Sequence, residues 1–356
     1  MKKSAIVFIM FLSIGCSNEK GNTLQIPEDI NDGVSVSNVK SHDFDTLLLS
    51  QLNTDIYNGM YGEIHSLLIM RDDELVVEQY HREGDRDEIH FLASVTKGFV
   101  AILVGIAIDQ GYIDSLNQPM LDYFPEYKEA EKDRRKHNVT IEHLLTMTSG
   151  FEWDELTLPF TDPNNDGVRM DAVEDKLDAS LKLKMDTVPG TKYVYCGPND
   201  IILGEIIKEA SKQNIEEFAI KNLFKPLQIT EYRWGSRNGV YHTAGGLWMK
   251  SRGMLKFGQL LLNDGNVGET NVISKNWIDK TFTPYIEITK PFYMGYQWRS
   301  VISENGYHSN FVSGNGGQLI VVFHELNMVL VVTADNRGKK YPLGELVERV
   351  LEFSLN

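Results

Sequence analysis

The sequence predicts an α+β fold in which one antiparallel sheet is formed from both ends of the chain and is flanked by helices. Two short segments of strand-like composition, residues 65–70 and 75–80, lie near the N-terminus, and the pattern returns after about residue 230. Residues 112–230, between these regions, have mainly helical spacing interrupted by irregular loops. The middle third of the chain is therefore expected to be a helical lobe inserted into the sheet domain.

The spacing of apolar residues predicts the first elements. A helix is expected at 45–57, where leucine and isoleucine recur on one face. Arg71-Asp72-Asp73 separates the next two apolar segments, which together predict a β-hairpin. The helix expected at 94–110 is apolar on nearly all sides, which is typical of a helix buried in the core. Gly111 can end it in the left-handed conformation that helix C-termini favour.

The later elements are predicted from the same signals. Helices are expected at 141–147 and 199–210. Two more are expected, one capped by Ser251 and running through residue 262, and one capped by Ser274 and running through residue 281. The sequence further predicts strands at 293–300, 318–323 and 328–333, a tight link at 324–327 and a closing helix at 342–355.

Composition places the chain among globular proteins. It has 356 residues, of which 42% are hydrophobic and 24% are charged, so it can bury a sizeable core. The formal net charge is -15, which repels polyanions at long range and argues against a nucleic-acid partner. The basic residues at 132–136 alternate with acidic ones and are interpreted as a solvated helix end or loop.

The N-terminus has the pattern of a targeting segment. Lys2 and Lys3 precede eleven apolar residues at 5–15, fewer than the roughly 20 that a membrane-spanning helix needs. Cys16 then follows Ser-Ile-Gly, which resembles a bacterial lipobox, although the usual leucine three places before the cysteine is absent. We expect a signal peptide at 1–15, lipidation of Cys16, a tether at 16–43, and an exported protein anchored to the membrane by lipid, facing the periplasm or the cell surface. Plain secretion after cleavage remains an alternative.

Ser94-Val95-Thr96-Lys97 is the segment most suggestive of chemistry. Residues three apart on a helix share a face, with about 5–6 Å between their Cβ atoms, so the ammonium of Lys97 can reach the hydroxyl of Ser94. A hydroxyl beside an amine is an activated nucleophile. The same spacing occurs at Ser17 and Ser37, but neither begins an apolar helix. The alternative is a capping serine followed by a lysine that extends to the surface.

Four ordered segments resemble the serine β-lactamase and penicillin-binding protein superfamily. They cover the chain from about residue 46 to 354, and the likeness is strongest to its class C-like branch, which includes esterases, D-amino-acid peptidases and 6-aminohexanoate-dimer hydrolases. The segments are FLASVTK at 91–97 followed by GYID at 111–114, IEHLLTMTSG at 141–150, YCG at 195–197 followed by LGEII at 203–207, and GGL at 245–247 with GNGGQ at 314–318.

The resemblance implies a β-lactamase/transpeptidase-like fold and a role for each matched residue. Ser94 is implied as the nucleophile, and Lys97 and Tyr195 as its proton-transfer partners. The backbone N–H groups of Ser94 and Gln318 are implied as the oxyanion hole. Substrate is implied to lie along Gly197, Asn315, Gly316 and Gly317. Neither a metal ion nor an organic cofactor is required by this chemistry.

Two positions depart from the family pattern. Gly197 stands where the tyrosine motif usually has asparagine, and Asn315 stands where the third motif usually has lysine or histidine. Both changes remove groups that contact substrate, and the second gives up attraction for a substrate carboxylate. The acyl-transfer residues themselves remain.

We therefore expect a serine hydrolase that acts through an acyl-enzyme on a small ester, amide or peptide. A β-lactamase or D-Ala-D-Ala or D-amino-acid peptidase is one alternative, and a non-catalytic sensor lipoprotein is another. The hydrolase domain is expected at 44–354, with a sheet lobe at 44–97 and 231–354 and a helical lobe at 98–230.

Two further signals are weaker. The acidic loop at 161–178 begins like a calcium-binding loop, but its twelfth position is Val173 rather than glutamate, so a loop at the mouth of the cleft is favoured. Cys16 and Cys196 are the two cysteines of the chain, and lipidation of the first would leave the second unpaired, so no internal disulfide is expected. Cys196 is interpreted as a small packed side chain.

Overall fold

The computed structural model describes residues 24–339 and 341–355. The predicted signal peptide at 1–15 and Cys16 lie outside these residues. Among the helices of the described part, none combines the length and apolar character needed to cross a membrane.

The predicted α+β fold, with its sheet formed from both chain ends, is confirmed. Eight antiparallel strands run in the order β10-β11-β12-β13-β14-β15-β1-β2, so the C-terminal strand β15 pairs directly with β1. The pairing aligns Ile64 of β1 with Ala334 of β15. The strands are β1 (Ile64–Arg71), β2 (Glu74–Tyr80), β10 (Ile286–Thr289), β11 (Phe292–Met294), β12 (Arg299–Ile302), β13 (His308–Gly314), β14 (Gln318–Phe323) and β15 (Met328–Ala334).

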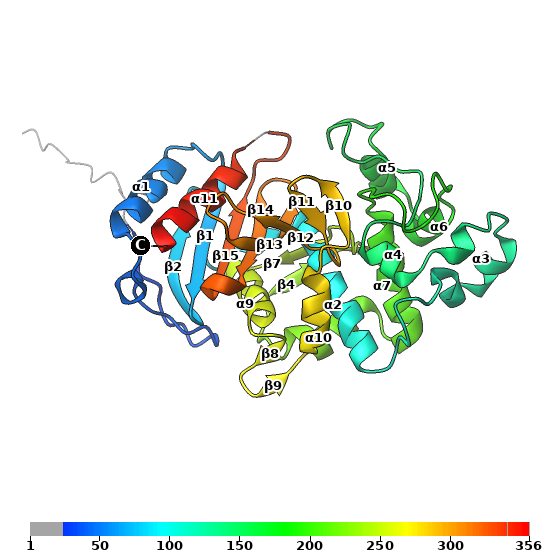
Figure 1. Cartoon of the computed structure of the whole chain (residues 1–356), viewed down its shortest axis with the longest axis horizontal. Helices are drawn as coiled ribbons and strands as arrows, with labels where there is room; N and C mark the ends of the chain where they lie inside the picture. The colour runs from blue at the N-terminus through cyan, green and yellow to red at the C-terminus, as the bar shows by residue number, and fades with distance from the viewer. Residues whose placement is uncertain (1–23, 340, 356) are drawn as a thin grey trace, which may run out of the picture.

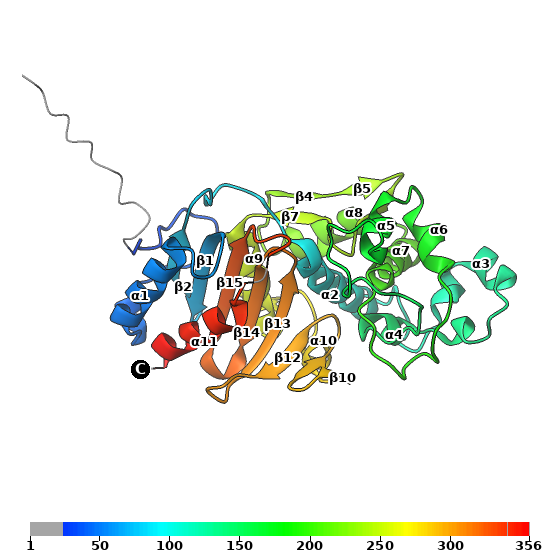
Figure 2. The same cartoon turned by 90° about the horizontal axis from the view of Figure 1, so that it is seen from above.

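Helices cover both faces of this sheet (Figures 1 and 2). On one face, α1 (Thr46–Tyr57) packs beside α11 (Leu343–Ser354), and their apolar residues form a core with the alternate residues of β1, β14 and β15. On the other face lie α9 (Ser251–Leu262), α10 (Lys275–Phe282) and α2 (Thr96–Asp109). This second face carries the larger core and continues into the helical region.

α2 connects the sheet to the helical region, and its residues are buried from Thr96 through Ala107. It contacts β13 on one side and α7 (Pro198–Ser211) on the other, so the predicted lobe boundary at residue 97 falls at its first turn. A Cβ atom at Gly105 would lie 2.3 Å from the Trp277 ring. Glycine at this position therefore lets α10 approach α2 closely.

The helical region lies at the opposite end of the molecule from α1 (Figure 1). It contains α3 (Pro125–Ala130), α4 (Ile141–Leu145), α5 (Asp166–Ala172), α6 (Lys176–Leu181), α7 and α8 (Ile215–Ala219). Three small sheets complete the fold of the described residues. One has the strand order β3 (His90–Phe91), β7 (Leu247–Met249), β4 (Tyr232–Trp234). The second pairs β5 (Ser236–Arg237) with β6 (Val240–Tyr241), and the third pairs β8 (Asn266–Val267) with β9 (Thr270–Asn271).

Two local predictions are wrong. The strand expected at 293–300 is broken into β11 and β12, because Gln297 has a left-handed φ of 62° and the chain turns between them. The predicted cap Ser251 is instead the first residue of α9, which begins after Lys250 without a side-chain cap. Ser274 does cap α10 through the Trp277 N–H, as predicted.

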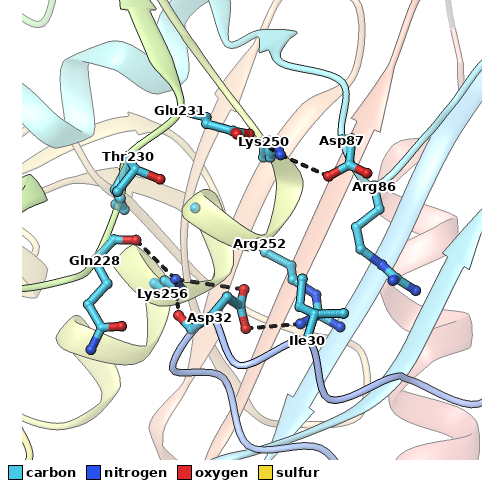
Figure 3. Close-up of a pocket in the computed structure, with 12 residues that line it drawn as sticks. Ile30, Asp32, Arg86, Asp87, Gln228, Thr230, Glu231, Lys250, Arg252 and Lys256 are labelled. Carbon is cyan, nitrogen blue, oxygen red and sulfur yellow. Dashed lines mark hydrogen bonds and ion pairs between the residues drawn. The ribbon is translucent and has the colours of Figure 1, made fainter.

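The described part of the predicted tether packs on the sheet domain. Asp32 accepts a hydrogen bond of 3.0 Å from Arg252, and its backbone carbonyl accepts one from Lys256. Arg252 also forms a buried ion pair with Glu78 of β2, with 2.7 Å between Nη2 and Oε2. Figure 3 shows Asp32 between the two cations of α9. These charges are satisfied by one another and hold the N-terminal segment in place.

Candidate active site

Ser94 lies in a tight turn between β3 and α2. Ala93 precedes it with a left-handed φ of 46°, an uncommon conformation for a residue with a side chain. The hydroxyl of Thr96 donates to the Ala93 carbonyl at 2.7 Å and accepts from the Leu247 N–H at 3.2 Å. A 3-10 turn at Ala93–Val95 then leads into α2. The strained turn is thus fixed from two sides and presents Ser94 at the helix entrance.

Lys97 reaches the hydroxyl of Ser94 as the spacing predicted. Its Nζ atom lies 3.2 Å from Ser94 Oγ and also donates to the Ala244 carbonyl. The side chain is only 3% exposed, so the alternative of a lysine extending to the surface is wrong. Burial opposes its charge, but the neighbouring Tyr195, Asp200 and Glu155 outweigh burial and raise the pKa of Lys97. Lys97 is therefore an ammonium group at neutral pH.

Tyr195 is brought to the same place from the segment that precedes α7. The Lys97 Nζ atom lies 5.0 Å from the centre of the Tyr195 ring, and the ring is largely buried. The guanidinium of Arg299 lies 5.3 Å from the same ring centre and donates to Ser313 Oγ at 3.1 Å. The structure thus brings the three predicted catalytic side chains together and adds a second cation that sequence reasoning missed.

Two buried carboxyl groups behind Lys97 were also missed. Asp200 in α7 is fully buried, and neither of its carboxyl oxygens has a hydrogen-bond partner among the described residues. Burial raises the pKa of Asp200 well above its usual range, although the charge of Lys97 opposes this. Glu155 is 5% exposed, and its Oε2 accepts from the Gly197 N–H at 3.1 Å and from Trp153 Nε1 at 2.8 Å. No motif in the sequence singles out either residue.

A cavity of about 300 Å³ opens over Ser94 and Lys97. Of the predicted substrate-binding residues, Gly197 and Asn315 line it, whereas Gly316 and Gly317 do not. The rest of the lining comes from β3 and the turn of Ser94, the loop after residue 150, α5, the start of α7 and the loop before β7. These residues are Phe91, Ala93, Trp153, Glu155, Phe160, Gly167, Val168, Met170, Asp171, Pro198, Ile201, His242, Ala244 and Gly245.

The glycine-rich segment meets the Ser94 turn at Gly314. A Cβ atom at Gly314 would lie 2.3 Å from the Leu92 carbonyl oxygen, so β13 approaches the Ser94 turn here. Gln318 begins β14, pairs with Gly314, and exchanges hydrogen bonds between its side-chain amide and the Ala334 backbone. Gln318 is not among the residues that line the cavity, and the assignment of its backbone N–H to the oxyanion hole stays a prediction.

The acidic loop at 161–178 is mostly helical, because it contains α5 and α6. Asn165 caps α5 by accepting from the Gly167 and Val168 N–H groups. Asp171 reaches the cavity rim, where it lies 2.7 Å from His242 Nε2 and 3.3 Å from Lys176 Nζ. The loop therefore forms part of the cleft mouth, as the sequence favoured.

Comparisons with known proteins show the family and the fold of this chain. The family model described as Beta-lactamase matches residues 59–343. The chain is 24% identical over 231 residues to the 6-aminohexanoate-dimer hydrolase of Paenarthrobacter ureafaciens, covering 60% of this chain and 56% of that protein. The chain thus spans about half the length of that curated relative.

Two solved structures show the same fold. One is a 6-aminohexanoate-dimer hydrolase-like protein from Bacillus anthracis, with a TM-score of 0.74 and 18% identity over 85% of this chain and 81% of that one. The other is a penicillin-binding protein from Bacillus halodurans, with a TM-score of 0.67 and 18% identity over 85% of this chain and 99% of that one.

Proposed function

The chain belongs to the beta-lactamase family, and we propose that it is a serine hydrolase that cleaves an ester or amide bond through a covalent acyl-enzyme on Ser94. The observation that supports this most directly is the 3.2 Å contact between Lys97 Nζ and Ser94 Oγ, buried beside Tyr195 at the base of a cavity. A hydroxyl in contact with an ammonium that itself lies beside a phenol is an arrangement for nucleophilic catalysis.

The contacts of Lys97 bear on how the proton moves, because its Nζ donates to Ser94 Oγ and to the Ala244 carbonyl and its neighbours raise its pKa. As an ammonium, Lys97 stabilises the negative charge that develops on the Ser94 oxygen rather than accepting a proton first. As the Ser94 oxygen bonds to the carbonyl carbon and the bond to the leaving group breaks, the Tyr195 hydroxyl accepts the Ser94 proton and passes its own to the leaving group. Water then attacks the acyl carbonyl, Tyr195 accepts its proton and passes a proton to Ser94 Oγ, and the acid product leaves.

The developing oxyanion needs two backbone donors, each typically worth 10²–10³ in rate. The Ser94 N–H is one. For the second, we propose the Gln318 N–H, because Gln318 begins β14 opposite Gly314, the residue at which β13 meets the Ser94 turn.

The cavity favours an ester or amide over a β-lactam or a peptide that ends in a carboxylate. Asn315 offers no positive charge, and outside the Ser94–Lys97 pair the cavity is lined by the carboxylates of Glu155 and Asp171 and by His242, which pairs with Asp171 at 2.7 Å. Turnover of a chromogenic cephalosporin at the rate of a short-chain nitrophenyl ester would instead favour the β-lactamase and peptidase alternative.

The test is covalent labelling of Ser94. We expect a fluorophosphonate to add its phosphonyl mass to the peptide that contains Ser94, and to abolish hydrolysis of a nitrophenyl ester. The Ser94→Ala variant, which removes only an oxygen, is expected to be neither labelled nor active. Ligand binding without turnover, unchanged in Ser94→Ala, would favour the sensor alternative.

We also propose that the chain is exported and anchored by lipid on Cys16, on the strength of the lysines, apolar segment and cysteine at its N-terminus. Metabolic labelling with a palmitate analogue tests this. Label in the wild type and none in Cys16→Ala is expected, and equal labelling of both would reject the anchor.

A further inference from the structure

The lining of the cavity combines carboxylates with aromatic rings. Trp153, Glu155 and Phe160 come from the loop after residue 150 and Asp171 comes from α5, and we call these four residues the acidic wall. Aromatic faces and carboxylates both attract a cation, the first through the ring quadrupole and the second through charge. Together they are the groups that recognise organic ammonium ions.

We propose that the acidic wall binds an organic ammonium group of the substrate, with Glu155 as its principal anionic partner. The inference rests on the hydrolase function proposed above and names its substrate class: esters or amides that carry a positive charge a few bonds from the reacting carbonyl. It is carried by the position of Glu155, by its packing on Gly197 and by the balance of charge around the cavity.

Glu155 is held with one oxygen committed and one open. The Gly197 N–H and Trp153 Nε1 both donate to Oε2, which fixes the direction of the carboxylate. No hydrogen bond within residues 24–339 and 341–355 engages Oε1, although the side chain is 95% buried and lines the cavity. Burying a carboxylate is costly unless its oxygens find partners, so the open oxygen favours a cation or donor that enters the cavity.

Gly197 lies against Glu155. A Cβ atom at Gly197 would lie 3.0 Å from Glu155 Oε2 and 3.4 Å from the Ala244 Cβ. The Glu155 carboxylate therefore packs closely on Gly197, at the position where the tyrosine motif usually carries asparagine. The cavity presents a negative group beside this position.

Other charges near the cavity are already engaged. Lys97 donates to Ser94 and Ala244, and Arg299 donates to Ser313 and does not line the cavity. Asp171 has its own partners in His242 and Lys176, so it adds negative potential at the rim rather than an open oxygen.

The competing explanation is that Glu155 serves only Lys97, whose charge it helps to stabilise. The two roles differ in a measurable way. Loss of a substrate contact lowers kcat/KM for a cationic substrate selectively, whereas loss of a counter-ion for Lys97 lowers kcat for every substrate equally.

The experiment compares two nitrophenyl esters of the same shape: the ester of γ-trimethylammoniobutanoate and its isostere with a tert-butyl group in place of trimethylammonium. We expect kcat/KM to favour the cationic ester by about tenfold or more in the wild type. Glu155→Gln keeps an acceptor for the Gly197 N–H and should reduce the preference to about one. Phe160→Leu, at a ring that is 43% exposed, should reduce it by about two- to fivefold.

Glu152→Gln is the matched control. It removes an exposed carboxylate three residues away in the same loop, which does not line the cavity, and should leave the preference unchanged. An equal loss of kcat/KM for both esters in Glu155→Gln would overturn the inference and leave Glu155 as a counter-ion of Lys97.

A binding measurement separates failure of this inference from failure of the proposed function. We titrate the Ser94→Ala protein calorimetrically with butyltrimethylammonium, and expect binding that is lost on adding Glu155→Gln. Binding without hydrolysis of either ester by the wild type would reject the hydrolase and keep the ammonium site. Equal hydrolysis of both esters without binding would reject the ammonium site and keep the hydrolase.

Discussion

Gly314 offers the sharpest test of how the fold shapes the site. A Cβ atom there would lie 2.3 Å from the Leu92 carbonyl oxygen and 3.0 Å from the Ala93 Cβ. Carbon and oxygen atoms normally approach to about 3.3 Å, so Gly314→Ala must separate β13 from the Ser94 turn by about 1 Å. The turn cannot easily yield, because the Leu92 N–H is bonded to the Leu247 carbonyl at 2.9 Å.

A displacement of about 1 Å in a catalytic arrangement typically lowers the rate about 10²-fold. Overpacking of this kind costs about 1–3 kcal/mol of unfolding free energy. We therefore expect Gly314→Ala to remain folded and to lose about 10²-fold in kcat/KM for a nitrophenyl ester, with stability followed by urea denaturation. Gly344→Ala is the control, because its Cβ meets nothing within 4 Å in helix α11. A folded Gly314→Ala protein with activity within twofold of wild type would refute the reasoning.

Three further predictions follow from the geometry. Tyr195→Phe should lower kcat about 10²–10⁴-fold with little change in stability, because it removes the hydroxyl that takes the Ser94 proton but keeps the buried ring. The control variant Tyr193→Phe, two residues earlier, should lower kcat less, and equal losses of kcat would contradict the assignment of Tyr195. Burial lowers the pKa of His81 to about 4, so between about pH 6.5 and 4 the unfolded chain binds more protons than the folded chain. The unfolding free energy should therefore fall by about 2–3 kcal/mol as the pH drops from 6.5 to 4.5. Urea denaturation should show a smaller fall for His81→Gln. Arg252→Met should cost about 3–5 kcal/mol in the same assay, because it removes the closest cation of buried Glu78 and leaves it only the more distant Arg86, at 3.5 Å. Adding Glu78→Leu should recover much of that loss, and no recovery would place the cost elsewhere.

The fold could be predicted where apolar spacing was strong. The uniformly apolar segment after Ser94 predicted the buried helix α2, and the strand patterns at both ends predicted one shared sheet. The break between β11 and β12 could not be predicted, because Gln297 takes its left-handed conformation inside a packed turn rather than from any turn signal in the sequence. Local propensity does not specify such tertiary constraints.

The candidate active site was likewise predictable only in part. The three-residue spacing of Ser94 and Lys97 predicted their contact, because a helical turn fixes it. Glu155 and Asp200 meet Lys97 only through the packing of distant segments, which a single sequence does not encode as a pattern. The sequence showed a glycine-rich stretch but not which of its glycines touches the Ser94 turn, which is Gly314.

The central claim is that a substrate acyl group is carried on Ser94. Its most direct test is intact-mass analysis of the protein acid-quenched during turnover of a slowly hydrolysed nitrophenyl ester, followed by peptide mapping. The account predicts a transient mass increase equal to the acyl group, located on the peptide that contains Ser94 and absent from Ser94→Ala. Turnover that persists in Ser94→Ala, or an acyl group carried on another residue, would contradict it.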